Sequence, residues 1–166
     1  TVLPMAKLLA KHDESMIITD PKGEIYEETA EYLKSLGYNI VRLNFRDPQQ
    51  GNSWNPMHLP FTLYKNGNSD KAAELLDDLA LNILYDENNK GQDPFWEKTS
   101  ADYFSGLAMG LFEDAKEEEV NLNSISLMDT VGDERFGASR YINEYFKMKG
   151  ESSSAYMLAS NTINDL

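Results

Sequence analysis

The residues MIIT, at positions 16–19, form an apolar run that ends at Asp20. Nucleotide hydrolases use an acid in this position, at the end of a buried strand, to hold a magnesium ion. A turn is the plainer interpretation, since Asp20-Pro21 can end a strand and lead into a helix. For this motif alone the turn is favoured, and a small α/β nucleotide hydrolase that uses Asp20 with magnesium is the alternative.

The sequence contains no phosphate-binding loop of the form G-x-x-x-x-G-K-[ST]. In such a loop the backbone N–H groups, the lysine and the hydroxyl together bind the phosphates and magnesium. No glycine here precedes Lys-Ser or Lys-Thr, and Lys98-Thr99 follows Trp96-Glu97 within an expected helix. Lys22-Gly23, at the start of another expected helix, could still contact an anion.

Residues for nucleophilic catalysis are also missing. The chain has no cysteine and no G-x-S-x-G sequence, which excludes thiol nucleophiles, disulfides and the serine elbow. Its two histidines, His12 and His58, have no serine or aspartate at a spacing typical of a catalytic set. We therefore assign no catalytic residue and no metal site to this sequence.

Acidic side chains are unevenly distributed along the chain. The formal net charge is −13, and residues 61–119 carry five basic and fourteen acidic side chains, a net charge of −9. Neighbouring acids on a helix point in different directions, so a pair that shares a proton is not expected, and a solvated helix face is the plain interpretation. Such an acidic chain repels phosphates, which argues against non-specific nucleic-acid binding by this chain alone.

The first part of the chain shows the pattern of strand, helix and strand. Residues 3–12 are expected to form a short helix, and residues 16–19 and 38–45 read as apolar strands on either side of a helix that ends near Gly37. Strand, helix and strand form a βαβ unit with a parallel sheet. Two strands make a poor sheet by themselves, so residues 1–60 are predicted to be an incomplete βαβ segment.

Residues 61–166 are predicted to form a helical bundle. Residues 46–68 are rich in turn formers and read as a connector. Apolar residues at helical spacing, with capping residues, then predict helices and no confident strand. The fold class is thus mainly α with a small βαβ part, and the helices are expected at 69–84, 94–112, 123–131, 135–149 and 152–166.

Three motifs carry a resemblance to a known family. They are T-D-P-K-G-E at 19–24, E-E-T-A-E-Y at 27–32 and the turn Trp54-Asn55-Pro56, and the D-P-F-W sequence at 93–96 adds to them. Together they resemble the TraG-like coupling proteins of type IV secretion systems, the membrane-anchored ATPases of bacterial conjugation. The chain begins without methionine and ends in an expected helix, so we expect an excerpt of such a protein.

The resemblance implies a role for each part of the chain. Residues 1–60 would belong to a RecA-like nucleotide-binding domain, with Asp20, Lys22, Gly23 and Glu24 near its nucleotide edge, although a structural role at the helix start is the favoured explanation of these residues. The hexameric parent would use ATP and magnesium. Without a phosphate-binding loop, this chain is expected to have no ATPase activity and no cofactor of its own.

For residues 61–166 the resemblance implies an all-α domain that recognises substrates at the cytoplasmic face of the bacterial membrane. Its partners would be a relaxase or relaxosome accessory proteins, through their basic segments, with DNA handled only by the assembled parent. Helices that merely pack between motor subunits are the plainer possibility. The candidate partner-binding acids are Asp77, Asp78, Asp86, Glu87, Glu113, Asp114, Glu117, Glu118 and Glu119.

Overall fold

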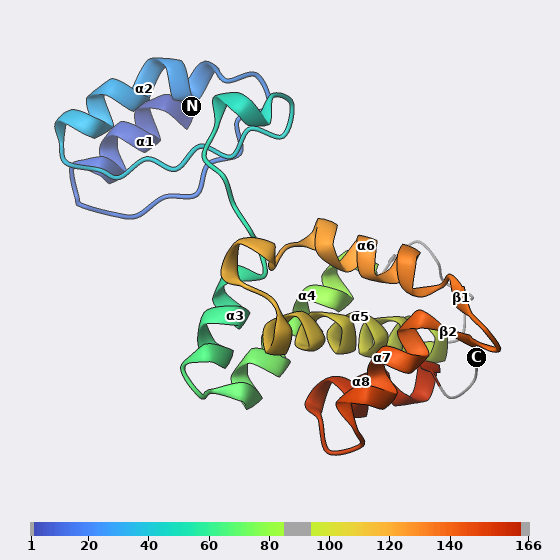
Figure 1. Ribbon diagram of the computed structural model, residues 1–166. Coiled ribbons are helices and arrows are strands. Elements are labelled where there is room, and N and C mark those ends of the chain that lie inside the picture. The colour runs from blue at the N-terminus through green and yellow to red at the C-terminus, as the bar shows by residue number, and fades with distance from the viewer. Residues whose placement is uncertain (1, 85–93, 164–166) are drawn as a thin grey trace. The chain divides into compact units, whose positions relative to one another are not determined.

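The computed structural model describes residues 2–84 and 94–163, which fall into two compact units (Figure 1). The first, here called the N-terminal unit, covers residues 1–54, and the second, the helical unit, covers residues 55–166. The sequence placed this boundary after residue 60. The difference arises because Met57 is fully buried in the core of the helical unit.

Two helices form the centre of the N-terminal unit. They are α1 (Val2–Ala10) and α2 (Glu24–Ser35), and a short 3₁₀ helix follows at Pro48–Gln50. Small side chains allow α1 and α2 to pack closely, and the buried residues are Ala6, Ala10, Thr29, Ala30 and Leu33. The Tyr38 hydroxyl donates a hydrogen bond to the carbonyl of Glu14 at 3.0 Å, which ties the segment after α2 to the end of α1.

The predicted βαβ unit is wrong in its two strands, since residues 16–19 and 38–45 are not strands. The backbone of Arg42 pairs with Asn52 instead: its N–H donates to Oδ1 of Asn52 at 2.8 Å, and its carbonyl accepts from the Asn52 N–H at 2.7 Å. Ile17 is fully exposed and Phe45 is 85% exposed. A two-stranded parallel sheet here would have no layer to cover its faces, so strand pairing would bury too little apolar surface to stabilise it.

The helical unit confirms the mainly α prediction. After the connector it contains α3 (His58–Lys65), α4 (Ser69–Leu84), α5 (Pro94–Asp114), a 3₁₀ turn η2 (Glu117–Glu119), α6 (Leu122–Gly132), α7 (Tyr141–Lys149) and α8 (Ser154–Ile163). Figure 1 shows α5 at the centre, with α4, α6 and α8 in contact with it.

Two local predictions in this unit differ from the structure. Residues 58–65, expected within a connector, form α3 because Phe61 packs its ring against that of Phe112, with centroids 5.4 Å apart. The helix expected from residue 135 begins at Tyr141, because residues 135–140 form a small antiparallel hairpin, β1 (Arg135–Phe136) with β2 (Ser139–Arg140). Gly137 lies in its turn with a φ of +64°, a value that favours glycine.

The core of the helical unit surrounds α5. Gly106 allows α8 to approach α5 closely, since a Cβ atom at this position would lie 2.7 Å from the Cβ atom of Ala159 and 2.9 Å from its backbone nitrogen. Close packing of this kind leaves no space for a larger residue. The largest buried side chains of the core are Met57, Leu76, Leu107, Met109, Phe112, Val120 and Phe146.

Candidate functional site

Asp20 accepts hydrogen bonds from the backbone at the start of α2, three residues before the N-cap residue Gly23. Its Oδ1 accepts a hydrogen bond from the Gly23 N–H at 3.0 Å, and its Oδ2 accepts one from the Tyr26 N–H at 2.9 Å. The first N–H groups of a helix lack intrahelical acceptors, and the carboxylate oxygens of an aspartate can accept their hydrogen bonds. The turn interpretation of the sequence therefore agrees with the geometry.

The surroundings of Asp20 do not fit a magnesium site. Both of its carboxylate oxygens accept backbone N–H groups, and in the part of the chain that the structure describes no three histidine or acidic side chains group around a possible metal position. Lys22 and Glu24 are exposed, with 4.0 Å between Nζ and Oε1, so their pair contributes little to stability. Gly23, at a φ of +84°, completes the turn into α2.

The Trp54-Asn55-Pro56 motif lies at the junction of the two units. Trp54 ends the N-terminal unit with an exposed side chain, and Asn55 begins the helical unit. The Asn55 side chain donates through Nδ2 to the carbonyl of buried Val120 at 2.6 Å and accepts from the Met57 N–H at 3.1 Å. The motif thus fixes the start of the helical unit, a role that sequence spacing could not reveal because Val120 lies 65 residues away.

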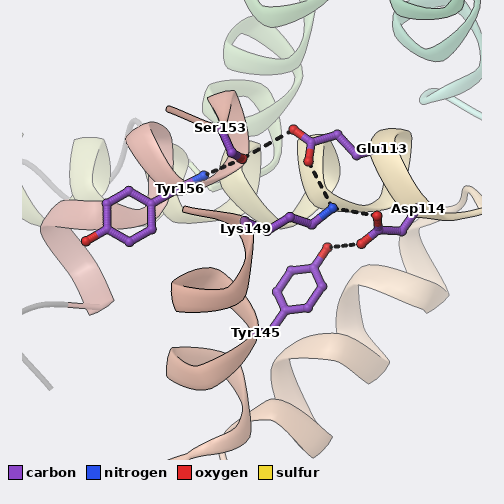
Figure 2. A network of polar contacts seen from close by, with 6 residues as sticks. All are labelled: Glu113, Asp114, Tyr145, Lys149, Ser153 and Tyr156. Atoms are coloured by element: carbon purple, nitrogen blue, oxygen red, sulfur yellow. Dashed lines mark hydrogen bonds and ion pairs between the residues drawn. The ribbon is translucent and has the colours of Figure 1, made fainter. Parts of the chain in front are cut away.

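Glu113 and Asp114, two of the predicted partner-binding acids, contact Lys149 within the molecule. The Lys149 ammonium nitrogen lies 2.9 Å from Oε2 of Glu113 and 2.5 Å from Oδ1 of Asp114. Figure 2 shows it between the two carboxylates, with the Tyr145 hydroxyl donating to Oδ2 of Asp114 at 2.8 Å. Both acids thus form ion pairs with the same lysine, and the group of three side chains keeps one net negative charge.

The electrostatics of this network favour its charged form. Burial by itself raises the pKa of Asp114, but the hydrogen bonds from Lys149 and Tyr145 outweigh it and hold the pKa below its usual range. Burial lowers the pKa of Lys149, and the bonds to Asp114 and Glu113 more than restore it. For Tyr145, burial and then the bond to Asp114 raise the pKa, so the hydroxyl stays protonated as a donor.

Ser153 extends the network to α8. Its hydroxyl donates to Oε1 of Glu113 at 3.4 Å and accepts from the Tyr156 N–H at 3.2 Å (Figure 2). Ser153 precedes α8 directly and caps its first turn. The network thus holds together the C-terminal end of α5, the end of α7 and the start of α8.

The other predicted acids fall into three groups. Glu117 lies near His58, with 3.6 Å between Oε1 and Nδ1, and Glu119 accepts from the Lys116 N–H at 2.8 Å. Asp77, Asp78 and Glu118 are exposed. Asp86 and Glu87 lie outside the described residues.

Asp102, on α5, is an acidic residue that sequence reasoning missed. Burial, followed by the nearby charge of Asp77 on α4, raises the pKa of the Asp102 carboxyl, and Lys98 opposes this shift. Asp77 and Asp102 are far apart in the sequence, so no pairing of adjacent acids includes them. Asp77 and Asp102 come together through the packing of α4 on α5, which the sequence does not display.

An apolar groove lies between the end of α4, α5 and α6. Its volume is about 350 Å³. Tyr103 and Asp129 both line the groove, and burial, followed by the Asp129 charge, raises the pKa of Tyr103. Sequence reasoning missed this groove as well. Its apolar lining comes from Ile83, Leu84, Phe104, Leu107, Leu122 and Ile125.

Comparisons with known proteins give one match. A family model described as type IV secretory system, conjugative DNA transfer, matches residues 2–161. Neither a curated protein nor a solved structure matches the chain. Along the described residues, no helix combines the length and the apolar character needed to cross a membrane.

Proposed function

The chain belongs to the type IV secretory system family of conjugative DNA transfer, and we propose that its helical unit recruits substrate proteins to the transfer machinery. The match confirms the resemblance to the TraG-like coupling proteins, a membrane-associated family whose full-length members are ATPases. It spans 160 of the 166 residues, whereas the three motifs that indicated the family lie within residues 19–56. The matched region therefore includes both the N-terminal unit and the helical unit.

The charge of the helical unit carries this proposal. Residues 55–166 contain nine basic and twenty acidic side chains, a net charge of −11. Several of these acids, including Asp77, Asp78 and Glu118, are exposed. Such a surface attracts basic protein segments and speeds their association, and it repels the phosphates of DNA. Relaxases and relaxosome accessory proteins with basic segments are the partners we propose, with DNA handled by the assembled machine.

The N-terminal unit contributes differently in this proposal. No catalytic site is evident among its described residues, so ATP and magnesium would act elsewhere in the full-length parent. Exposed apolar side chains such as Ile17, Val41 and Phe45 are suited to burial under further strands of a nucleotide-binding domain. We place the helical unit at the cytoplasmic face of the membrane, on a hexameric parent.

Binding to a relaxase tests the proposal directly. The 166-residue chain is titrated with a labelled relaxase at about 50 mM and about 300 mM salt, and the affinity is expected to fall at the higher concentration because charge pairs are screened. Asp77→Lys with Asp78→Lys should abolish binding without lowering the melting temperature.

A matched control is available in the N-terminal unit. Glu28→Lys with Glu31→Lys changes the same number of exposed charges on α2 and should leave relaxase binding intact. Absence of relaxase binding at both salt concentrations would overturn the proposal. Equal loss in both double variants would show that total charge, and not the helical unit, attracts the partner.

A further inference from the structure

We infer that the apolar groove between α4, α5 and α6 binds one amphipathic helical segment of a basic substrate protein, with a lysine or arginine of that segment on Asp129. This inference rests on the proposed recruitment function and locates its site. The occupant is defined by three features of the groove: its apolar lining, its exposed rim and the Asp129 carboxylate, the one acidic group among the described lining residues.

The rim of the groove is apolar and open to solvent. Ile83 is 48% exposed, Leu84 is 40% exposed and Leu122 is 38% exposed, and all three line the groove together with buried Leu107 and Ile125. Apolar side chains that gather around a concave surface are typical of sites for other macromolecules. Grooves between helices commonly accept the apolar face of an amphipathic helix, through residues spaced three and four apart.

Asp129 gives the groove its charge preference. Its side chain is exposed, and within residues 2–84 and 94–163 no lysine or arginine forms an ion pair with it. Nearby Asp133 differs, since Arg140 lies 2.8 Å from its carboxylate. Tyr103 lines the groove together with Asp129, and the carboxylate oxygens of Asp129 can accept hydrogen bonds from a cationic side chain.

Charge also selects among possible occupants. A second copy of this chain carries a net charge of −13 and the helical unit is itself acidic, so self-association through the groove would bring like charges together. A basic segment gains both the apolar burial and the long-range attraction. The groove therefore suits a Lys/Arg-bearing amphipathic helix rather than a second copy.

The test uses a fluorescein-labelled, helix-stapled peptide of about 14 residues, with leucines at one helical face and lysines on the other. One control peptide has the same composition with the leucines scattered around the helix, and another has glutamate in place of lysine. The first peptide is expected to bind at least about tenfold more tightly than either control. Methyl NMR signals of Ile83, Leu122 and Ile125 should shift on binding.

Protein variants locate the site. Ser126 lines the groove with an exposed side chain, so Ser126→Arg should fill the groove with a cation and weaken peptide binding at least about tenfold. Leu127→Arg introduces arginine at the adjacent position, which does not line the groove, and should leave peptide binding unchanged. Asp129→Asn removes the negative charge at nearly constant side-chain size and should weaken binding of the lysine peptide, while Asp78→Asn should leave it unchanged.

The outcomes separate this inference from the recruitment proposal. Relaxase binding that disappears in the Asp77/Asp78 double variant but persists in Ser126→Arg would keep recruitment and overturn the groove as its site. Peptide binding that is lost in Ser126→Arg, without any binding of relaxase to the chain, would keep the groove and overturn recruitment. Equal affinity for the three peptides, or methyl shifts confined to residues outside the groove, would overturn the inference.

Discussion

The ammonium nitrogen of Lys149 lies 2.5 Å from Oδ1 of Asp114, although 35 residues separate them in the sequence. The Lys149 side chain is 14% exposed and that of Glu113, its second partner, is 20% exposed, so water screens this second pair far less than surface pairs, whereas the Asp114 side chain is 52% exposed. The contact joins the ends of α5 and α7. Glu113 and Asp114, which the sequence suggested as part of a partner-binding surface, thus form ion pairs within the helical unit.

Replacing Lys149 with methionine should destabilise the helical unit by about 2–3 kcal/mol, because it leaves two neighbouring carboxylates without their shared cation. Urea unfolding followed by circular dichroism measures this change. Lys147→Met is the matched control: its pair with Glu144 is exposed and should be worth less than about 0.5 kcal/mol. Equal effects of the two variants would contradict the structural role of Lys149.

Asp102→Asn should raise the melting temperature slightly at pH 7. The pKa of Asp102 is raised in the folded state, so its charged form is disfavoured there, and this cost is fully present above the folded pKa. As the pH falls through the folded pKa the cost declines, and below 3.8, the unperturbed value, it is gone. The gain from Asp102→Asn should therefore vanish in acid.

Thermal unfolding of both proteins between pH 3 and pH 7 measures this difference. Asp78→Asn serves as the control, since Asp78 is exposed and is not among the charges that shift the pKa of Asp102. A gain that persists unchanged at pH 3 would show that the effect does not come from the Asp102 charge.

Gly106→Ala should destabilise the helical unit by up to about 2 kcal/mol. Alanine favours a helix over glycine by about 1 kcal/mol, but the added methyl group would overlap the backbone and side chain of Ala159 on α8, and such overpacking costs about 1–3 kcal/mol. Ser105→Ala, one residue earlier, should instead be neutral or stabilising by up to about 1 kcal/mol. Its Oγ is buried and has no hydrogen-bond partner within the described residues.

Chemical denaturation of the two variants side by side gives both free energies of unfolding. A stabilising Gly106→Ala would mean that α5 and α8 can separate at no cost, contrary to the close contact at Ala159.

Asp20→Ala should weaken the first turn of α2 by about 1 kcal/mol, whereas Asp20→Asn should keep most of the cap. Hydrogen exchange of the Gly23 and Tyr26 amides measures the change, because these two N–H groups donate hydrogen bonds to the Asp20 carboxylate. Magnesium should leave the melting temperature of all three proteins unchanged. A magnesium-dependent rise in the unsubstituted protein that Asp20→Asn removes would restore the alternative of a metal-dependent hydrolase.

The helices could be predicted because their signals are local. Apolar residues recur every three or four positions along 69–84, and Asp20 lies four residues before the start of α2, so capping residues and periodicity were sufficient. The predicted strands failed for the opposite reason. Whether residues 16–19 or 38–45 form strands depends on neighbouring strands and covering layers, which a short apolar run does not specify.

The candidate site was predictable in composition but not in geometry. The acidic residues of the helical unit could be identified from the sequence, yet nothing near Glu113 indicates that Lys149 neutralises it. Asp129 and Leu84 line one groove only because α4 and α6 both pack on α5. The two-residue strands at 135–140 were too short to produce an alternating pattern.

The hydrogen bond from Asn55 to Val120 has a consequence for the order of assembly during protein synthesis. Asn55 leaves the ribosome first, and at roughly 5–20 residues per second its partner follows about 3–13 seconds later. Helices α3, α4 and α5 lie between the two in the chain and can pair with their sequence neighbours during that interval. The Asn55 side chain can therefore form this hydrogen bond only after α5 has been synthesised. The start of the helical unit thus reaches its final structure late in synthesis.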